Sequence, residues 1–226
     1  MSTVAREQEI SVRRLAAVYL DGISTTVYPH VDIAPRYAAT GAAAVVMEDK
    51  TFPKDSSLRP GGRQVLVPVE EFQGKLAAAR ANGGGMLVVA RTEALIAGLG
   101  QADALRRGVA YAEAGADAVL IHSKQKTPGE ILAFCHAWPG RVPLVLVPTS
   151  YPQLSFADVA ALDKVGLIIC GNHAIRAAVA AMRDTFQRIL AKGGIAGVEA
   201  GIASVADVFA LQGDRHMRDL ERDFLR

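Results

Sequence analysis

The chain has 226 residues, 50% of them hydrophobic, so it can bury one substantial core and is most simply a single domain. Lysine and arginine total 25 against 23 acidic residues, and a net charge of +2 gives no reason to expect nucleic acid or an acidic membrane as partner. No stretch has the length of a membrane span or the apolar core of a secretory signal. We therefore expect a cytoplasmic protein, with Cys135 and Cys170 as small buried residues in a reducing compartment.

The first 34 residues contain one clear element. Leu15 to Leu20 is a short apolar run that predicts a buried strand, and Asp21 follows it directly. Residues 23 to 34 carry β-branched residues and a proline, with another proline next to them, which argues against a long regular helix. We expect that segment to be irregular.

From Arg36 onward the pattern is regular, and part of it repeats. The segments Tyr37 to Val45 and Tyr111 to Val119 share Tyr, Ala, Gly, Ala, Ala and Val in the same places. Each segment is typical of a helix end, a glycine stop and the start of a strand. Recurrence of one helix-to-strand joint favours repeated βα units, as in a (β/α) barrel.

Apolar runs alternate with segments of helical periodicity over the rest of the chain. Counting the run that begins at Leu15, six buried strands are predicted, at Leu15 to Leu20, Ala42 to Met47, Met86 to Ala90, Ala116 to Ile121, Val142 to Val147 and Val165 to Cys170. Helices are predicted at Val69 to Ala81, Gln101 to Ala114, Pro128 to Trp138, Phe156 to Lys164, His173 to Lys192 and around Val205 to Leu211.

The segment after Ala42 to Met47 concentrates chemistry. Glu48 and Asp49 follow the strand at once, and a loop with Lys54 and Ser56 comes next. A parallel strand delivers such residues to its carboxyl end, where α/β folds place their active sites. Carboxylates for a hard cation, lysines for an anion and a hydroxyl suit an acidic substrate bound with a metal. The alternative is a solvated charged loop.

Every predicted strand ends in polar residues. These are Asp21, Glu48-Asp49, Arg91-Thr92-Glu93, His122-Ser123-Lys124, Pro148-Thr149-Ser150 and Gly171-Asn172-His173. In a parallel array these ends face the same way, and burying so many polar groups without a ligand, a metal or each other would be costly. We expect a catalytic mouth there rather than structural capping.

At these residues the sequence resembles the phosphoenolpyruvate mutase and isocitrate lyase superfamily, and within it the phosphonopyruvate hydrolases. The likeness is nearly continuous from about Pro35 to the end. The matching stretches are Val46 to Leu58, Ala90 to Gly100, Ala114 to Lys124, Leu144 to Thr149 and Gly171 to Ala177.

The resemblance implies an α/β fold of the (β/α)8 TIM-barrel type, with Mg2+, or Mn2+ or Co2+, at the carboxyl ends of the strands and a mobile lid. It implies hydrolysis of the carbon–phosphorus bond of 3-phosphonopyruvate to pyruvate and phosphate, through a metal-bound pyruvate enolate. Metal coordination of the keto acid would stabilise that enolate as the leaving group.

Site residues carry over from the resemblance position by position. Glu48 matches the carboxylate that holds metal-bound water, Lys54 the lid lysine, and Arg91 the arginine that clamps the phosphonyl group. His122 matches a histidine that lines the pocket; the alternative is a core histidine satisfied by hydrogen bonds. Ser56 stands where mutases have Asn and hydrolases have Thr, and a hydroxyl that could orient water favours hydrolysis.

The sequence also departs from the superfamily pattern. Members begin with two further βα units before the strand matched by Leu15 to Leu20, and we expect this chain to lack them. Aligned without gaps from Glu48, Tyr19 stands at the position of the direct metal ligand, and Asp21 keeps the second carboxylate. A truncated relative that binds without turnover is therefore an alternative, as is a mutase or carbon–carbon lyase, although neither cysteine lies on the lid as in the lyases.

The expected organisation is one barrel domain over residues 1–226, with a divergent amino-terminal region, 1–34. Six strands cannot close an eight-stranded barrel without leaving two edges, and open edges pair with other chains. We therefore expect a homo-oligomer, a dimer or tetramer, or alternatively a rearranged amino-terminal region. The resemblance implies that the carboxyl-terminal helices of residues 173–226 can be exchanged between subunits.

Overall fold

The structure is a computed structural model that describes residues 34–225. The strand predicted at Leu15 to Leu20, the irregular segment after it and the candidate metal residue Asp21 lie outside these residues. The chain divides between Gly171 and Asn172 into two compact units. The single barrel domain expected over residues 1–226 stays a prediction.

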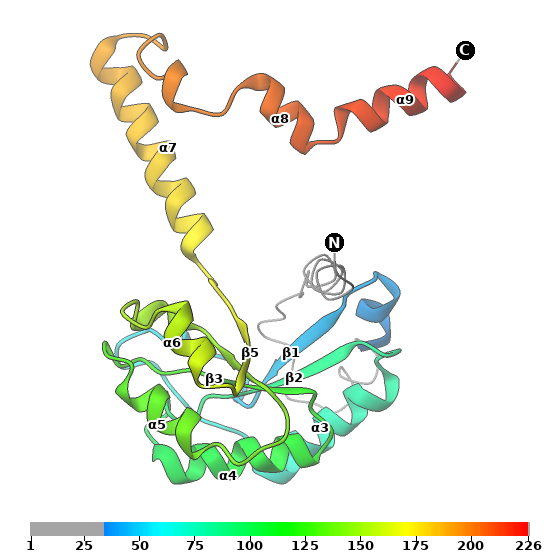
Figure 1. The fold of residues 1–226 in the computed structure, drawn as a ribbon, viewed down its shortest axis with the longest axis vertical. Coiled ribbons are helices and arrows are strands. Elements are labelled where there is room, and N and C mark those ends of the chain that lie inside the picture. Colours follow the sequence, from blue (N-terminus) through cyan, green and yellow to red (C-terminus); the bar gives the residue numbers. More distant parts are fainter. Residues whose placement is uncertain (1–33, 226) are drawn as a thin grey trace. The chain divides into compact units, whose positions relative to one another are not determined.

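The first unit is built on a five-stranded parallel sheet (Figure 1). Its strands are β1 (Ala44–Glu48), β2 (Leu87–Thr92), β3 (Ala118–Ile121), β4 (Leu144–Leu146) and β5 (Val165–Ile168), in that order across the sheet. Each lies at a predicted apolar run. Because every strand pairs in parallel with the next one along the chain, the connections run in one direction, as they do around a barrel.

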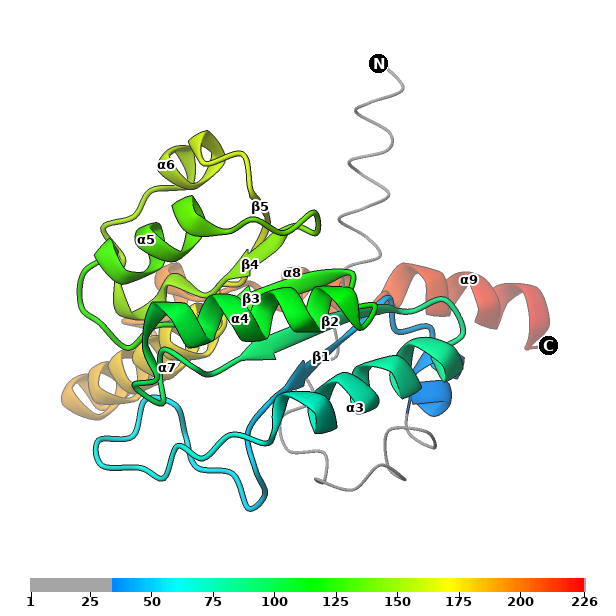
Figure 2. The same cartoon turned by 90° about the horizontal axis from the view of Figure 1, so that it is seen from below.

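The connecting helices are α3 (Val69–Asn82), α4 (Gly100–Glu113), α5 (Gly129–Ala137) and α6 (Phe156–Ala161). Figures 1 and 2 show α3, α4 and α5 on one face of the sheet, here named the helix face. The packing there is close: Phe72 of α3 meets Tyr111 of α4 edge-on, with ring centroids 4.7 Å apart. The helix face therefore holds most of the buried apolar side chains.

The opposite face of the sheet, here named the inner face, has its own small core. Its buried members are Val46, Val89, Ala118, Leu120 and Val145. Their neighbours in sequence lie in the cores of the helix face, as the period-two alternation of a strand requires. Strands buried on both faces are typical of parallel sheets, which explains the nearly continuous apolar runs in the sequence.

The repeated joint of the sequence has the same backbone geometry in both places. A helix over residues 34–39 ends before Gly41, with φ +81°, and α4 ends before Gly115, with φ +98°. Both glycines take the left-handed conformation that favours glycine. In each joint the next residue, Ala42 or Ala116, donates its N–H to the tyrosine carbonyl at the start of the repeat at 3.2 Å. The predicted helix–glycine–strand repeat is confirmed.

The second unit contains α7 (His173–Lys192), the 3₁₀ turn η2 (Glu199–Gly201), α8 (Val205–Leu211) and α9 (Asp214–Phe224). The first and third of these match their predicted bounds, whereas α9 was not predicted. Its few apolar residues, Met217, Leu220 and Phe224, have helical spacing among charged residues, and ion pairs such as Arg218–Asp214, at 2.8 Å, add support one turn apart. Among residues 34–225 no helix is long and apolar enough to cross a bilayer.

The two cysteines differ in exposure. Cys135 on α5 is buried, as expected, and burial raises the pKa of its thiol to about 11. Cys170 is exposed, so the expectation that both are buried is wrong for this residue. It lies two residues beyond the end of β5, a strand paired on only one side within the described residues, and it lacks the cover that a central strand has. Both cysteines are free thiols.

Candidate functional site

Strand register brings the polar strand ends together on the inner face. Glu48 at the end of β1 pairs with Arg91 on β2. Both follow the alternation set by Val46 and Val89, which lie in the inner-face core. His122 directly follows β3 and continues the alternation of Leu120. The sheet therefore brings these three predicted site residues to one rim.

Glu48 and Asp49 do not act as a pair, because consecutive strand residues point to opposite faces. Asp49 is fully buried on the helix-face side of the sheet. Its Oδ2 accepts hydrogen bonds from Thr92 Oγ1 at 2.9 Å and Tyr111 OH at 2.8 Å, and pairs with Arg107 Nη1 at 3.3 Å. Its Oδ1 accepts the Glu93 N–H at 2.9 Å. We name Asp49, Thr92, Arg107 and Tyr111 the buried knot.

The buried knot also fastens both ends of the loop that follows β1. Val67, where the loop returns, donates its N–H to the Asp49 carbonyl at 2.8 Å. Its own carbonyl accepts Arg107 Nη1 at 3.0 Å. Two residues further into the loop on each side, the Thr51 N–H donates to the Val65 carbonyl at 2.9 Å. The segment between Thr51 and Val65, here named the lid, is thus held at its base by groups of the sheet and of α4.

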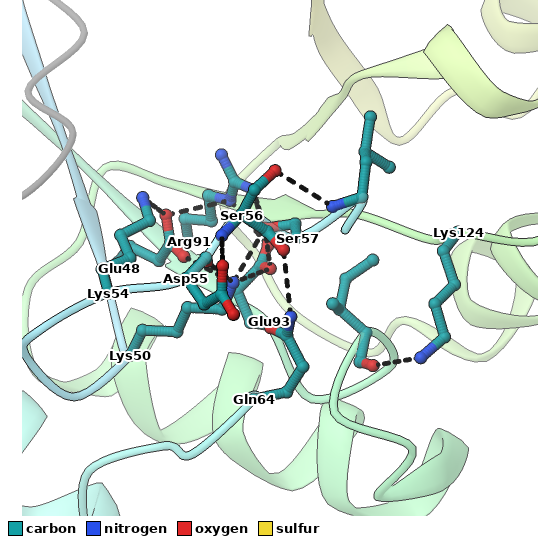
Figure 3. Close-up of polar contacts among 12 residues, drawn as sticks. Glu48, Lys50, Lys54, Asp55, Ser56, Ser57, Gln64, Arg91, Glu93 and Lys124 are labelled. Atoms are coloured by element: carbon teal, nitrogen blue, oxygen red, sulfur yellow. Dashed lines mark hydrogen bonds and ion pairs between the residues drawn. The ribbon is translucent and has the colours of Figure 1, made fainter. Parts of the chain in front are cut away.

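The rim carries a cluster of buried charges, shown in Figure 3. Arg91 binds Glu93 Oε1 through Nε at 2.8 Å and Nη2 at 2.7 Å, and lies 3.6 Å from Glu48 Oε2. Lys54 reaches back from the lid to Glu48 Oε2 at 2.6 Å. Lys50 lies 3.3 Å from Glu93 and 3.7 Å from Glu48. We name Glu48, Lys50, Lys54, Arg91 and Glu93 the rim cluster.

Of the two lid serines, Ser57 rather than Ser56 contacts the rim cluster. Ser57 Oγ accepts hydrogen bonds from Lys50 Nζ at 3.0 Å and Arg91 Nη2 at 3.1 Å, and it contacts Glu93 Oε2. Ser56 is exposed, and its hydroxyl accepts a long hydrogen bond from the Leu58 N–H at 3.4 Å. Ser57 and Glu93 were not predicted as site residues. The alternation that placed Arg91 on the inner face would have placed Glu93 there too.

The two carboxylates of the rim cluster have opposite protonation tendencies. Burial, together with the neighbouring charge of Glu93, raises the pKa of Glu48 to about 7, against the pull of Lys54. Burial also disfavours the charge of Glu93, but Arg91, Ser57 and Lys50 outweigh it and hold the pKa of Glu93 below its usual range. Glu93 is therefore the fixed negative charge of the cluster, and Glu48 is the carboxylate that gains or loses a proton more easily.

His122 lies beside these charges as a neutral ring. Burial and the nearby Arg91 lower its pKa to about 4, and a hydrogen bond to the main chain of Val147 only partly offsets them. Its Nδ1 is buried without a hydrogen-bond partner. A core histidine satisfied by hydrogen bonds would have both nitrogens occupied, so this open nitrogen favours the pocket role.

The depressed pKa of His122 predicts a specific loss of stability in acid. The unfolded histidine titrates near 6.5, so the unfolded state binds more protons as the pH falls from 6.5 toward 4. The contribution is present above pH 6.5 and is lost through this window. We expect it to lower the free energy of unfolding by about 2 kcal/mol between pH 7 and pH 5. Urea denaturation of wild type and His122→Gln at both pH values measures it; equal pH dependence of the two proteins would contradict it.

The described residues offer an outer site for a divalent cation rather than a full ligand set. Within residues 34–225, no three His, Cys, Asp or Glu side chains gather in a way that could hold a metal ion. Glu48 Oε1, however, is buried and makes no hydrogen bond, although it lies 3.7 Å from Lys50 Nζ. A buried oxygen of this kind fits a cation held through water, the role predicted for Glu48. The other predicted metal residue, Asp21, lies outside the described part of the chain.

Comparison with known proteins shows which family the chain resembles. A family model described as phosphoenolpyruvate phosphomutase matches residues 17–190. A phosphonopyruvate hydrolase of Variovorax sp. (strain Pal2) is 63% identical over 196 residues, which are 86% of this chain and 68% of that protein. A phosphoenolpyruvate phosphomutase of Tetrahymena pyriformis is 43% identical over 185 residues, or 81% of this chain and 61% of the relative. The chain thus spans roughly two thirds of the length of these relatives.

Solved structures give the same result. A crystal structure of phosphonopyruvate hydrolase in complex with oxalate and Mg2+ superposes with a TM-score of 0.83 at 56% identity, covering 93% of this chain and 72% of the other. A phosphoenolpyruvate phosphomutase from Streptomyces platensis subsp. rosaceus has a TM-score of 0.86 at 41% identity, with the same coverage. The predicted α/β fold of the barrel type is confirmed for the part shared with them, and so is the predicted kinship.

Proposed function

Because the chain belongs to the phosphoenolpyruvate phosphomutase family and is a close homologue of phosphonopyruvate hydrolase, we propose that it cleaves the carbon–phosphorus bond of 3-phosphonopyruvate with water. The products are pyruvate and phosphate. The observation that carries the proposal is the buried rim cluster, in which Arg91, Lys54 and Glu48 meet at the carboxyl ends of β1 and β2. Identity of 63% to a hydrolase, against 43% to a mutase, favours hydrolysis.

The charges of the rim cluster suit a phosphonate that arrives with a divalent cation. Three cationic side chains face two carboxylates, so the cluster is net positive when both acids are ionised. A phosphonate and a carboxylate on one small molecule exceed the charge of one divalent ion, which leaves the complex net negative. Opposite net charges in a buried site attract strongly because little water screens them.

Each residue has a separate task in the proposed reaction. Arg91 and Lys54 bind the phosphonyl oxygens and stabilise the charge that develops there. His122 is neutral at working pH, so it can hydrogen-bond the departing enolate or the incoming water without adding charge. Ser56 would orient that water once the lid rearranges around a substrate. The oxygen of the incoming water forms a new bond to phosphorus and the water gives up a proton, while the carbon–phosphorus bond breaks. The electron pair of the broken bond stays with the pyruvate enolate, whose carbon then takes a proton.

A divalent cation, Mg2+ or alternatively Mn2+ or Co2+, would supply Lewis acidity that polarises the keto acid and stabilises the leaving enolate. Glu48, whose Oε1 makes no hydrogen bond, would hold the cation through water. Asp21 is the second carboxylate proposed for this cation. The relative solved with oxalate and Mg2+ supports the same ion.

The direct test is turnover by the whole chain. With phosphonopyruvate and added Mg2+, Mn2+ or Co2+, we expect phosphate and pyruvate to appear in equal amounts, and a chelator to stop both. Formation of phosphoenolpyruvate instead would assign a mutase. Absence of turnover, together with calorimetric binding of Mg2+ and oxalate, would assign a relative that binds without catalysis.

Two further proposals concern the oligomeric state and the cellular location of the protein. We retain the homo-oligomer, since α7 exposes a regular apolar stripe, formed by Ile175, Val179, Met182, Phe186 and Leu190. The cytoplasm suits the two free thiols, Cys135 and Cys170.

A further inference from the structure

Glu93 makes contacts that the proposed reaction does not use. The residue is fully buried. Its Oε1 receives both Nε and Nη2 of Arg91, at 2.8 and 2.7 Å. Its Oε2 contacts Ser57 Oγ and lies 3.3 Å from Lys50 Nζ. Both carboxylate oxygens are thus occupied by groups able to bind an oxyanion.

These contacts resemble those that a bound anion would make. An arginine presents a planar set of N–H donors that matches carboxylate and phosphate alike. Here two of these donors, Nε and Nη2, already bind the carboxylate of Glu93. Glu93 directly follows the last residue of β2, two positions after Arg91, and its N–H is held by Asp49 Oδ1, so the backbone fixes the pairing.

We propose that Glu93 is a built-in competitor anion, which weakens the hold of Arg91 on oxyanions so that the product phosphate leaves readily. This inference rests on the proposed function. The substrate and phosphate compete with Glu93 alike, but the substrate also carries a carboxylate and a keto group that make further contacts. Phosphate has neither of these groups and binds through its oxygen atoms alone. Competition by Glu93 therefore weakens the binding of the product more than the binding of the substrate. Glu93 acts through Arg91 and is a positioning residue in this sense.

The test is the affinity for inorganic phosphate, measured by calorimetry on the whole chain with and without Mg2+. Glu93→Gln keeps the shape but removes the charge, and we expect phosphate to bind at least about tenfold more tightly, because a buried charge a few ångströms away is lost. Glu93→Asp keeps the charge and should stay close to wild type. Steady-state kinetics of Glu93→Gln should show stronger inhibition by phosphate.

A matched control is Glu130→Gln. Glu130 also contacts a strand-end serine, Ser123, but it lies outside the rim cluster. We expect its phosphate affinity to equal that of wild type, whereas a gain as large as that of Glu93→Gln would show a general charge effect and overturn the proposal.

Other outcomes are equally decisive. Unchanged or weaker phosphate binding by Glu93→Gln overturns the proposal. Glu93→Ala is the second neutral variant, and failure of both neutral variants to fold would assign the carboxylate to the fold and reject the competitor role. Phosphate binding is measured without turnover, so the two failures are distinguishable. A chain that fails to hydrolyse phosphonopyruvate but gains phosphate affinity on loss of Glu93 would reject the proposed function and the role in product release, and would retain only the competition of Glu93 with oxyanions at Arg91.

Discussion

Replacement of Arg91 by lysine is expected to lower kcat/KM for phosphonopyruvate by about 10²–10³-fold, the usual effect of removing one donor to a developing oxyanion. Arg91 is 7% exposed and already binds Glu93 through two nitrogens. A lysine keeps the positive charge but presents one ammonium group, which cannot satisfy Glu93 and hold a phosphonate in the same geometry. Steady-state kinetics with the preferred metal ion measure the effect.

Stability and a second arginine serve as controls for this variant. Since the charge is kept, Glu48 and Glu93 are not left beside a missing cation, and the free energy of unfolding should fall far less than in Arg91→Ala. Arg80→Lys changes an exposed arginine that pairs with Asp117 on the helix face, and its kinetics should match wild type. Undiminished turnover in Arg91→Lys would remove Arg91 from the proposed reaction.

Two features of the sequence predict the strand ends well. Apolar runs fix where β1, β2 and β3 end, and parallel order brings those ends together. The residue types then identify Glu48, Arg91 and His122 as the polar groups at one rim. For these positions, strand pattern and residue chemistry suffice.

The roles of neighbouring residues depend on which face each strand presents. The sequence pattern predicts that Asp49 binds a cation together with Glu48. Because consecutive strand residues point to opposite faces, however, the Asp49 side chain lies in the interface with α4. Glu93 reads as one more polar strand end, although the same alternation makes it the partner of Arg91. Which lid serine reaches the rim cluster depends on loop geometry, and no periodicity in the sequence encodes it.

Asp49 is the acceptor that the other members of the buried knot share. We expect Asp49→Ala to lower the free energy of unfolding by roughly 3–5 kcal/mol, the range for a buried ion pair that loses one partner. Thr92 and Tyr111 would lose their shared acceptor, and the Glu93 N–H would lose its own. Among the described residues Arg107 would keep one carboxylate partner, Asp103, at 2.9 Å. Urea denaturation followed by the single tryptophan, the buried Trp138, measures the loss.

Asp49→Asn separates the charge of the knot from its hydrogen bonds. Burial raises the pKa of Asp49, although the Glu93 N–H, Tyr111 and Arg107 act against it, so burial destabilises the charged carboxylate. The amide keeps an acceptor oxygen and carries no charge. We therefore expect Asp49→Asn to lower the free energy of unfolding by only about 1–3 kcal/mol. Glu113→Ala removes an exposed carboxylate from α4 and should change stability by no more than about 0.5 kcal/mol.

The position of the knot at the base of the lid adds a local effect to this global one. Arg107 Nη1 binds both the Asp49 carboxylate and the Val67 carbonyl. Loss of the Asp49 charge therefore loosens Arg107 and weakens its hold on the return of the lid before the sheet unfolds. Trypsin should then cut Asp49→Asn after Arg63 of the lid faster than wild type under native conditions, as mass spectrometry of the fragments would show. Equal cleavage rates, with the stability loss still present, would mean that the knot supports the sheet and α4 without controlling the lid.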